Sequence, residues 1–366
     1  MYLCHKETDT HSFFIVAKHF LIYSLLGLAL LPWLSGCAGT KTLSGAGATF
    51  PAPFYIEVAK QYGDAEDIHV SYGGVGSGAG QRNLAEMTVD FGGTDEFLSD
   101  EKIAKAMPMP IIHIPTCIGG IVIAYNLEGI EELRLTPEVI SGIYTGRITE
   151  WSDPAIRELN PNLTLPDQKV IPIYRTDGSG TTFVFSSYMS KVDSVWREEL
   201  GAAKTLDIKV GNAAKGNPGV AGVISSTPGA IGYIGSEYSM ALGIPAAAIR
   251  NRSGHFIAPT MESISLSANL SDFPDDTRVM IADSPDPDAY PISTMTWLIV
   301  YKEQSYGHRS LESARLLQDF LYYIVGEETH EAARKTHYAS LPPLALEKAR
   351  AVIASMTYQG KLLSEP

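Results

Sequence analysis

The sequence is short of basic residues and of cysteine, and it has no long uninterrupted hydrophobic run. Across 366 residues, 28 Lys and Arg stand against 41 Asp and Glu, so the formal net charge is -13 at pH 7. This balance argues against a nucleic-acid partner, because such partners usually require a basic face that displaces counterions. At long range it also argues against an anionic ligand. Charged residues at 19% and hydrophobic residues at 45% are typical of a globular chain, here long enough for two domains.

Cysteine is represented by Cys4, Cys37 and Cys117 alone. Three widely spaced cysteines provide neither a disulfide framework nor a zinc site. Cys117 lies in the apolar run IPTCIGGIVI, residues 114–123, which is typical of a strand. We therefore expect Cys117 to be a small buried hydrophobic residue and not a reactive thiol.

The longest apolar stretch near the start of the chain is Phe20–Leu31, which at twelve residues is too short to cross a bilayer of about 30 Å as a helix. Lys6 and Lys18 precede it, and the small residues of Leu34-Ser-Gly-Cys37 follow it. This arrangement is typical of a secretory signal peptide. The sequence Leu-Ser-Gly-Cys also resembles a bacterial lipobox, in which Cys37 becomes the acylated first residue of the mature protein.

The prediction is therefore a signal peptide over 1–36 and a tether over 37–44 that begins with lipidated Cys37. The mature protein would be exported and lipid-anchored to the cell membrane, facing the periplasm or the extracellular side. Two alternatives remain open, an uncleaved amphiphilic anchor and a signal cut elsewhere. Glu7 and Asp9 depart from the usual basic start of a signal peptide, so the true start of translation can lie further downstream.

Beyond the tether, apolar β-branched runs alternate with helical patterns, which indicates α/β domains with largely parallel sheets. The predicted strands are 68–72, 119–125, 169–174 and 295–301. Helix starts with a capping residue followed by proline are predicted at Thr136 and Asp153, and two further helices at 310–325 and 342–356. The Pro/Asp-rich stretch 283–291 interrupts the pattern and is typical of a hinge or linker.

Three Gly-rich turns bear hydroxyl groups, and each opens a helical pattern. They are GAGATFP at 45–51, YGGVGSGAG at 72–80 and RTDGSGTT at 175–182, with helices predicted over 54–62, 81–87 and 183–191. A helix N-terminus attracts anions, because its first N–H groups lack intrahelical acceptors and carry partial positive charge. One such turn is usually ordinary capping. Three turns in one chain, one of them with an arginine, indicate an oxyanion site.

Other motifs fit less well. GVGSGA at 74–79, with Asp95 downstream, loosely matches a dinucleotide fingerprint, but its third glycine position is alanine and an exported protein meets little NAD. GNAAKG at 211–216 lacks the Lys-Ser/Thr of a P-loop, and neither Ser77 nor Ser179 lies in Gly-x-Ser-x-Gly. The histidines show no paired metal-binding spacing. We therefore expect no enzymatic activity, no catalytic residue, no cofactor and no metal.

Several motifs in a fixed order resemble one family. They are GAGATFPAP at 45–53, VDFGGTD at 89–95 with Leu98-Ser-Asp100, IYTGRITEW at 143–151, RTDGSGTTFVF at 175–185, GNPGV at 216–220 and YASLP at 338–342. Together they look like the substrate-binding protein of the bacterial phosphate ABC transporter, over nearly all of the chain beyond residue 44.

This resemblance implies an α/β, two-lobed periplasmic-binding-protein fold (Venus flytrap), class II. Each lobe would be a mixed sheet flanked by helices, and crossing hinge strands would join the lobes. Lobe 1 would comprise 45–117 plus 291–366, and lobe 2 would comprise 118–290. The phosphate ligands would fall on Thr49, Phe50, Ser77, Asp95, Arg175, Ser179, Gly180 and Thr181. The departures from the family pattern lie beside these positions, at Thr94, Tyr174 and Glu96-Phe97.

The chemistry of the residues agrees with these roles. The guanidinium of Arg175 can grip two phosphate oxygens, and Asp177 would orient it. Asp95 can accept a hydrogen bond from the proton that phosphate still carries near neutral pH, whereas sulfate has none and would place lone pair against lone pair. Two plainer readings remain: Asp95 as a helix cap for the segment after Leu98, and Arg175 as a structural ion pair.

The predicted function is extracytoplasmic binding of inorganic phosphate and its delivery to the membrane permease subunits of a phosphate ABC transporter, by a monomer. One alternative is the same fold binding arsenate or, less favoured because of Asp95, sulfate or molybdate. Another is a secreted phosphatase or adhesin on this scaffold. The net charge does not oppose an anion site, because screening over ~10 Å makes the global field a poor guide to a buried site.

Overall fold

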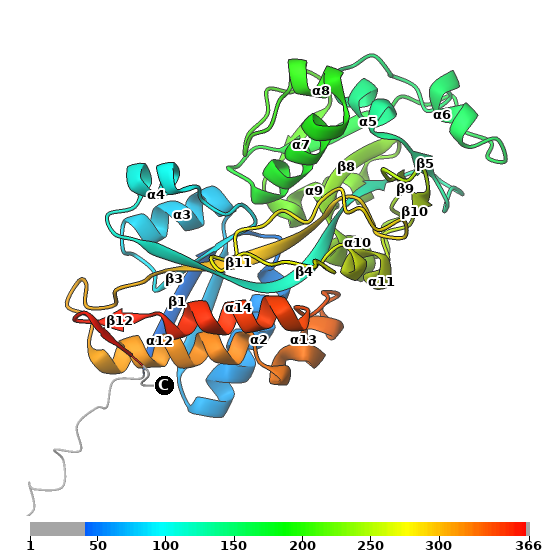
Figure 1. Ribbon diagram of the computed structural model, residues 1–366. Coiled ribbons are helices and arrows are strands. Elements are labelled where there is room, and N and C mark those ends of the chain that lie inside the picture. Colours follow the sequence, from blue (N-terminus) through cyan, green and yellow to red (C-terminus); the bar gives the residue numbers. More distant parts are fainter. Residues whose placement is uncertain (1–40, 364–366) are drawn as a thin grey trace, which may run out of the picture. The chain divides into compact units, whose positions relative to one another are not determined.

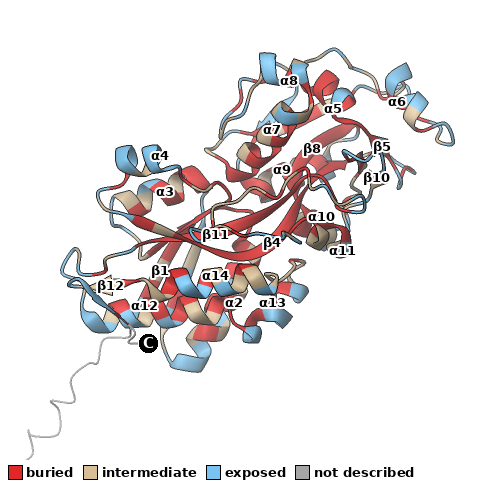
Figure 2. Ribbon diagram, viewed as in Figure 1, coloured by how far each residue is buried: buried red, intermediate tan, exposed pale blue. Residues whose placement is uncertain are grey.

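Two apolar strands, β4 (Ile111–Tyr125) and β11 (Ser293–Tyr301), pair antiparallel in the middle of the main sheet. Every residue of β11 is buried, and so is every residue of β4 except Ile112. Figure 2 shows them as a buried core between partly exposed helices. The computed structural model describes residues 41–363, and those from Thr42 onward belong to one compact unit.

The main sheet has eight strands in the order β2-β1-β3-β11-β4-β8-β6-β7 (Figure 1). The remaining six are β1 (Thr42–Gly47), β2 (His69–Gly74), β3 (Phe91–Thr94), β6 (Ile171–Arg175), β7 (Asn212–Ala214) and β8 (Ala230–Gly235). Strand β4 pairs with β11 up to Gly120 and with β8 from Ile121 onward. We call β2, β1, β3, β11 and the first part of β4 the first half-sheet, and the last part of β4 with β8, β6 and β7 the second.

The strand directions differ from the largely parallel sheets that the alternation predicted. The outer pairs β1–β2, β1–β3, β6–β8 and β6–β7 are parallel, whereas β3–β11, β11–β4 and β4–β8 are antiparallel. The sheet is therefore mixed in both halves, as the family resemblance implied. In the first half-sheet the cause is β11, which returns from far along the chain and enters between β3 and β4, and in the second it is the antiparallel pairing of β4 with β8.

Helices cover both half-sheets. Their bounds are α2 Ala52–Glu66, α3 Ser77–Ala85, α4 Asp100–Ala106, α5 Pro137–Tyr144, α6 Pro154–Leu159, α7 Gly180–Val192, α8 Ser194–Glu199, α9 Gly216–Ser226, α10 Ser236–Leu242, α11 Met261–Leu266, α12 Leu311–Ile324, η1 Glu327–Thr329, α13 His330–Lys335 and α14 Pro343–Ala354. Short strands complete the structure: β5 Arg134–Leu135, β9 Ala248–Arg250, β10 Phe256–Ile257, β12 Thr357–Tyr358 and β13 Lys361–Leu362. Helices α2, α3 and α14 pack on the first half-sheet, and α7 and α9 on the second.

The local helix signals are confirmed. Thr136 and Asp153 cap α5 and α6 through their side chains, each with proline as the next residue. Helices α2, α3 and α7 begin at Ala52, Ser77 and Gly180, a few residues earlier than predicted, because the Gly-rich turns themselves supply the first helical residues.

The described residues test only one of the predictions for the N-terminal part of the chain. Strand β1 begins at Thr42, inside the segment 37–44 that was expected to be a tether, because Thr42–Gly47 pairs in parallel with β2. The predicted signal peptide over 1–36 and Cys37 lie outside the described residues. Among the helices that are described, none is long and apolar enough to cross a membrane.

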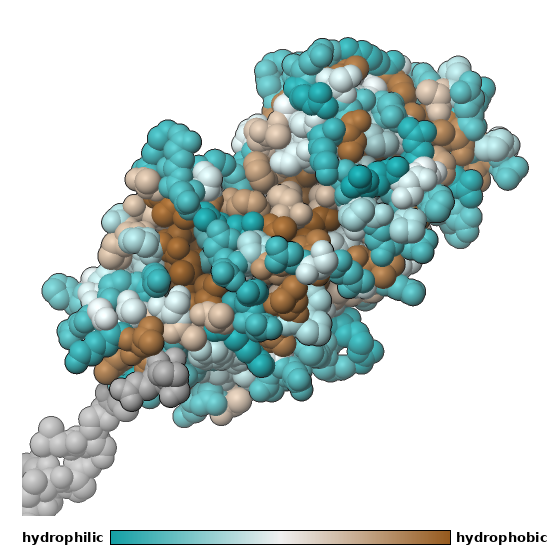
Figure 3. Space-filling model, in the orientation of Figure 1, coloured by the Kyte–Doolittle hydropathy of each residue, from teal (hydrophilic) through white to brown (hydrophobic). Residues whose placement is uncertain are grey.

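Core and surface separate as expected for a globular chain. Cys117 is fully buried and unpaired, and burial raises the pKa of its thiol well above the ordinary value. Trp151, Trp196 and Trp297 are also fully buried. Figure 3 shows hydrophilic residues over most of the visible face, with smaller hydrophobic patches between them.

Candidate anion-binding site

The candidate site lies where strands of the two half-sheets end. Strand β1 ends at Gly47 and lies between β2 and β3. The connection that follows β1 leads to β2 on one side of it, whereas β3 lies on the other side. In open α/β sheets, ligands bind beyond the carboxyl ends of strands at such a point. The turn carrying Thr49 and Phe50 follows β1, Asp95 follows β3, and Arg175 is the last residue of β6 in the second half-sheet.

Hydrogen bonds join the turns of the two half-sheets directly. The Gly78 N–H donates to the Gly178 carbonyl oxygen over 2.8 Å, and the Gly180 N–H donates to Ser77 Oγ over 3.2 Å. The Thr181 hydroxyl donates to Asp95 Oδ2 over 3.5 Å. The structure therefore brings the turn at 72–80 and Asp95 against the turn at 175–182.

All eight predicted ligand residues are buried. Their exposed fractions are Thr49 5%, Phe50 0%, Ser77 0%, Asp95 1%, Arg175 2%, Ser179 0% and Thr181 0%, with Gly180 also buried. Ser179 Oγ accepts from the Thr182 N–H and so caps α7. That hydroxyl is thus engaged in capping.

Backbone donors at three helix starts are unpaired. Phe50, Ser77 and Thr181 lie just before or within the first turns of α2, α3 and α7, where an N–H has no intrahelical acceptor. Within residues 41–363 no other group accepts a hydrogen bond from these three N–H groups. Together with the partial positive charge of helix N-termini, they form a set of donors suited to an oxyanion.

Arg175 is held by Asp177 and keeps one donor free. Its Nε donates to Asp177 Oδ1 over 2.8 Å and its Nη2 to Asp177 Oδ2 over 2.5 Å. Its Nη1 is buried without any acceptor among the described residues. Asp177 also accepts from the Gly216 N–H, and although burial raises the pKa of Asp177, its bonds to Arg175 and Gly216 bring that pKa below the ordinary value. The predicted orienting contact is present, and a buried cationic donor without a partner calls for an anion.

Asp95 is a buried carboxyl in a ring of hydroxyl donors. Its Oδ1 accepts from the Thr296 hydroxyl over 2.9 Å, and its Oδ2 faces the Thr181 hydroxyl. Burial raises the pKa of Asp95 to about 7, although the Thr296 hydrogen bond and the charge of Arg175 act in the opposite direction. Asp95 does not cap a helix, because Ser99 caps α4 by accepting from the Lys102 N–H.

Asn217 was not among the predicted site residues, yet the Asn217 side chain bridges both half-sheets. Its N–H and Nδ2 donate to Thr49 Oγ1 over 3.1 Å each, and Nδ2 also lies 3.1 Å from Thr181 Oγ1. Its Oδ1 accepts from the Gly235 N–H. Asn217 lies within the GNPGV motif, which was the only signal that could have drawn attention to it.

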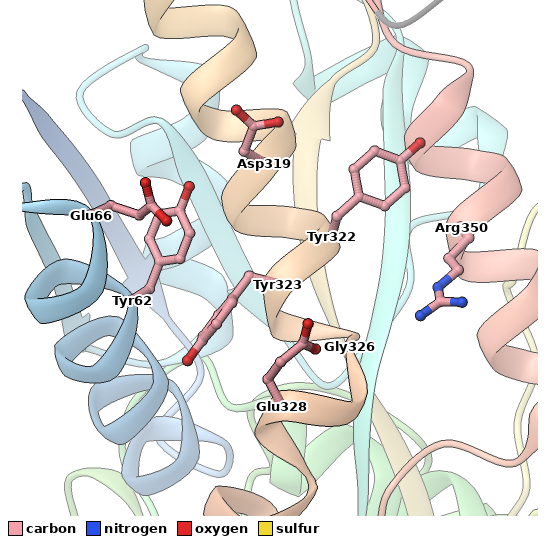
Figure 4. A pocket seen from close by; sticks show the side chains of 8 residues that line it. All are labelled: Tyr62, Glu66, Asp319, Tyr322, Tyr323, Gly326, Glu328 and Arg350. Atoms are coloured by element: carbon pink, nitrogen blue, oxygen red, sulfur yellow. The ribbon is translucent and has the colours of Figure 1, made fainter. Parts of the chain in front are cut away.

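The pocket in Figure 4 lies elsewhere and has a volume of about 450 Å³. It is lined by Tyr62, Glu66, Asp319, Tyr322, Tyr323, Gly326, Glu328 and Arg350, which come from α2, α12, α14 and the segment after α12. Three carboxylates on its wall oppose an anion, and none of the predicted ligands lines it. No cluster of potential metal ligands occurs in the described part of the chain.

Comparisons with known proteins agree with this architecture. A family model for a PBP superfamily domain matches residues 36–328. The phosphate-binding protein PstS of Xylella fastidiosa is 32% identical over 317 residues, which are 86% of this chain and 85% of that protein. The PstS of Methanocaldococcus jannaschii is 32% identical over 358 residues, with coverages of 87% and 91%.

Two solved structures have the same fold at low sequence identity. A high-affinity periplasmic phosphate-binding protein determined with phosphate (PfluDING) has a TM-score of 0.70 at 20% identity, over 85% of this chain and 93% of that one. The phosphate-binding protein of Stenotrophomonas maltophilia has a TM-score of 0.65 at 18% identity, over 85% and 94%. The fold and the facing turns therefore define a periplasmic-binding-protein architecture. Within it, the chain belongs to the PstS family of phosphate-binding proteins.

Proposed function

We propose that this protein binds inorganic phosphate outside the cytoplasm and delivers it to the permease of a phosphate ABC transporter. The observation that carries the proposal is Arg175, whose buried Nη1 has no acceptor although Asp177 holds the rest of the guanidinium. The N–H groups of Phe50, Ser77 and Thr181, at the starts of α2, α3 and α7, are further donors without an acceptor. A tetrahedral oxyanion would satisfy these donors together.

Asp95 supports phosphate over anions that carry no proton. A carboxylate oxygen accepts a hydrogen bond from the protonated oxygen of HPO₄²⁻, whereas sulfate and molybdate have no proton with which to donate one. An unpaired buried acceptor costs about 1–3 kcal/mol, and more when it is charged. Arsenate carries the same proton as phosphate, so Asp95 does not separate these two ions.

The proposed moving units are 45–117 with 291–366, and 118–290. Opening would break the bonds between Thr49 and Asn217 and between Ser77 and Gly180, and phosphate would favour the closed form by contacting both sides. The closed form would then be the one that the permease recognises. The relatives carry the name phosphate-binding protein, and the described residues contain no cluster of potential metal ligands on which a metal-dependent phosphatase could rely.

Export and lipidation of Cys37 belong to the same proposal, and the Leu34–Cys37 sequence is their basis. Labelling of cells with radioactive palmitate should mark the protein, and Cys37→Ser should abolish the label. Release of the wild-type protein into the medium without label would contradict the anchor.

Calorimetry tests the central proposal. The purified protein, stripped of bound phosphate, should give saturable heat with phosphate and none with sulfate at pH 8. Saturable binding of sulfate, or no heat with phosphate, would overturn the assignment. Hydrolysis of a chromogenic phosphate ester would instead favour an enzyme.

A further inference from the structure

Glu237 is a buried carboxyl group that the predicted site does not use. It lies in the first turn of α10, directly after β8, and is 1% exposed. Neither of its carboxylate oxygens accepts a hydrogen bond from any residue in 41–363. A buried carboxylate without a partner is costly, and each such group in a folded protein needs an explanation.

Among residues 41–363, no cationic side chain contributes to the electrostatics of Glu237. The titratable groups around it are the carboxyl of Asp95 at the end of β3, the thiol of Cys117 on β4, and the phenols of Tyr238 on α10 and Tyr338 after α13. The Tyr338 hydroxyl donates its single proton to the carbonyl oxygen of Phe50. Its oxygen therefore presents a lone pair to Glu237. A protonated carboxyl can donate to that lone pair, whereas a carboxylate would meet it with another lone pair.

Contacts from both half-sheets enclose Glu237. On one side, Gly235 is bonded through Asn217 to Thr49, and Tyr238 donates to the Thr49 carbonyl oxygen over 2.7 Å. On the other side, Tyr338 and Phe50 close the space. Opening of the site would break the bonds that Thr49 makes with Asn217 and Tyr238, and so would admit water to Glu237.

We infer that Glu237 takes up a proton when the two half-sheets close over the anion, so that phosphate binding is linked to proton uptake at a residue outside the predicted ligand set. This inference rests on the proposed function. In the closed form Glu237 is a positioning residue: as a neutral acid it donates to Tyr338, which in turn bonds to the carbonyl oxygen of Phe50 and so holds the backbone whose N–H is a proposed phosphate donor.

The sign of the linkage follows from burial. In the closed protein burial raises the pKa of Glu237 well above its ordinary value, and the negative charge of Asp95 adds to that rise. In an opened, hydrated site the pKa would be near that of a free glutamate. Closure therefore takes up a proton between these two values. The contribution of Glu237 to affinity is complete below the open-state pKa and declines as pH rises toward the closed-state pKa.

Calorimetry in buffers with different ionisation enthalpies measures the protons taken up per phosphate. Phosphate and Asp95 also exchange protons, but they do so in wild type and in Glu237→Gln alike. At neutral pH the wild-type protein should take up more protons than E237Q, by a difference that approaches about one. The dissociation constants should also diverge with rising pH, because only the wild type loses affinity at Glu237, by up to about tenfold per pH unit.

Equal proton uptake in wild type and E237Q, with phosphate binding intact, would overturn the inference and leave the proposed function standing. Absence of phosphate binding in the wild type would overturn both. If E237Q does not fold, Glu237→Met provides a second neutral variant of similar length. Infrared difference spectra of the wild type should in addition show a protonated carboxyl band appearing with phosphate. A spectrum without that band would contradict the inference.

Discussion

The hydroxyl of Tyr238 donates a 2.7 Å hydrogen bond to the carbonyl oxygen of Thr49, a residue 189 positions away in sequence. That carbonyl belongs to the same peptide group as the N–H of Phe50, one of the unpaired donors at the candidate site. A hydrogen bond accepted at one end of a peptide group polarises the N–H at its other end. Tyr238 thus both joins the half-sheets and strengthens a proposed phosphate donor.

Replacing Tyr238 with Phe should weaken phosphate binding roughly three- to tenfold, because a net hydrogen bond contributes about 0.5–1.5 kcal/mol. Most of the loss should be faster dissociation, measurable by stopped-flow fluorescence. Tyr301→Phe is the matched control, since its hydroxyl donates over 2.7 Å to the Leu84 carbonyl away from the site. Equal dissociation rates in Y238F and Y301F would argue against a role of the Tyr238–Thr49 hydrogen bond in holding the closed form.

Arg175→Lys should lower phosphate affinity by roughly 10- to 100-fold or more. Lysine cannot keep two bonds to Asp177 and still offer a third donor, and each hydrogen bond to a charged group contributes about 1.5–3 kcal/mol. Arg309→Lys tests buried arginine in general, because Arg309 pairs with Asp90 outside the site. Titration calorimetry of both variants should show a large loss for R175K alone, and a similar loss in both would contradict the role of Arg175.

Gly180→Ala should hinder closure. A Cβ at Gly180 would lie 2.4 Å from Ser77 Oγ and 2.8 Å from Asp95 Cβ, both in the first half-sheet region. Overpacking of this kind costs about 1–3 kcal/mol, so phosphate affinity should fall roughly 5- to 150-fold. In Gly222→Ala on α9 a Cβ meets no atom within 4 Å, so that variant should bind normally. Small-angle scattering with phosphate should show G180A less compact than G222A, and identical profiles would refute the prediction.

From the raised pKa of Asp95 we predict that anion selectivity depends on pH. Because the pKa of Asp95 is raised to about 7, the residue gains a proton as pH falls below that value. Neutral Asp95 can donate to a sulfate oxygen, so sulfate binding should strengthen by up to about tenfold per pH unit as pH falls toward about 7, and should level off below that value. Asp95→Asn should narrow the gap between phosphate and sulfate and remove this pH dependence. A gap in D95N as wide as in wild type would refute the repulsion argument.

The same carboxyl should limit stability at alkaline pH. A folded-state pKa of about 7 lies above the ordinary value of 3.8, so the ionised form is disfavoured in the phosphate-free protein and stability declines as pH rises through about 7. The shift corresponds to at most about 4 kcal/mol. Without phosphate, the melting temperature of D95N should therefore exceed that of the wild type by more at pH 8 than at pH 5. Differential scanning calorimetry measures both, and an equal gain at the two pH values would contradict this cause.

Short sequence motifs predicted those elements of the fold that are determined by interactions within a few residues. Thr136-Pro137 and Asp153-Pro154 begin helices because capping and a fixed φ act within one turn. The path of β4 through both half-sheets has no local signal: the predicted strand 119–125 is only its last part, since pairing with β11 extends it back to Ile111. Likewise the parallel-sheet prediction missed that β11 enters between β3 and β4.

The candidate site shows the same division. Helix-opening turns and Arg175 could be predicted from residue types, and the family resemblance supplied the full set of eight predicted ligands. Asn217, Glu237 and Tyr238 could not be found in this way, because their contacts join segments far apart in sequence. A glutamate after an apolar strand is typical of an exposed helix start, and only the tertiary structure, which brings Tyr338 and Cys117 into its surroundings, makes it a buried acid.

The insertion of β11 between β3 and β4 has a consequence for synthesis. The first half-sheet is built from strands near the start of the chain and from Ser293–Tyr301, which leaves the ribosome late. Until then β3 and β4 lack the strand that joins them, and non-local pairing of this kind is slow to form. A nascent chain with an unfinished sheet stays unfolded for longer, which would suit the proposed export of this protein through a translocation channel.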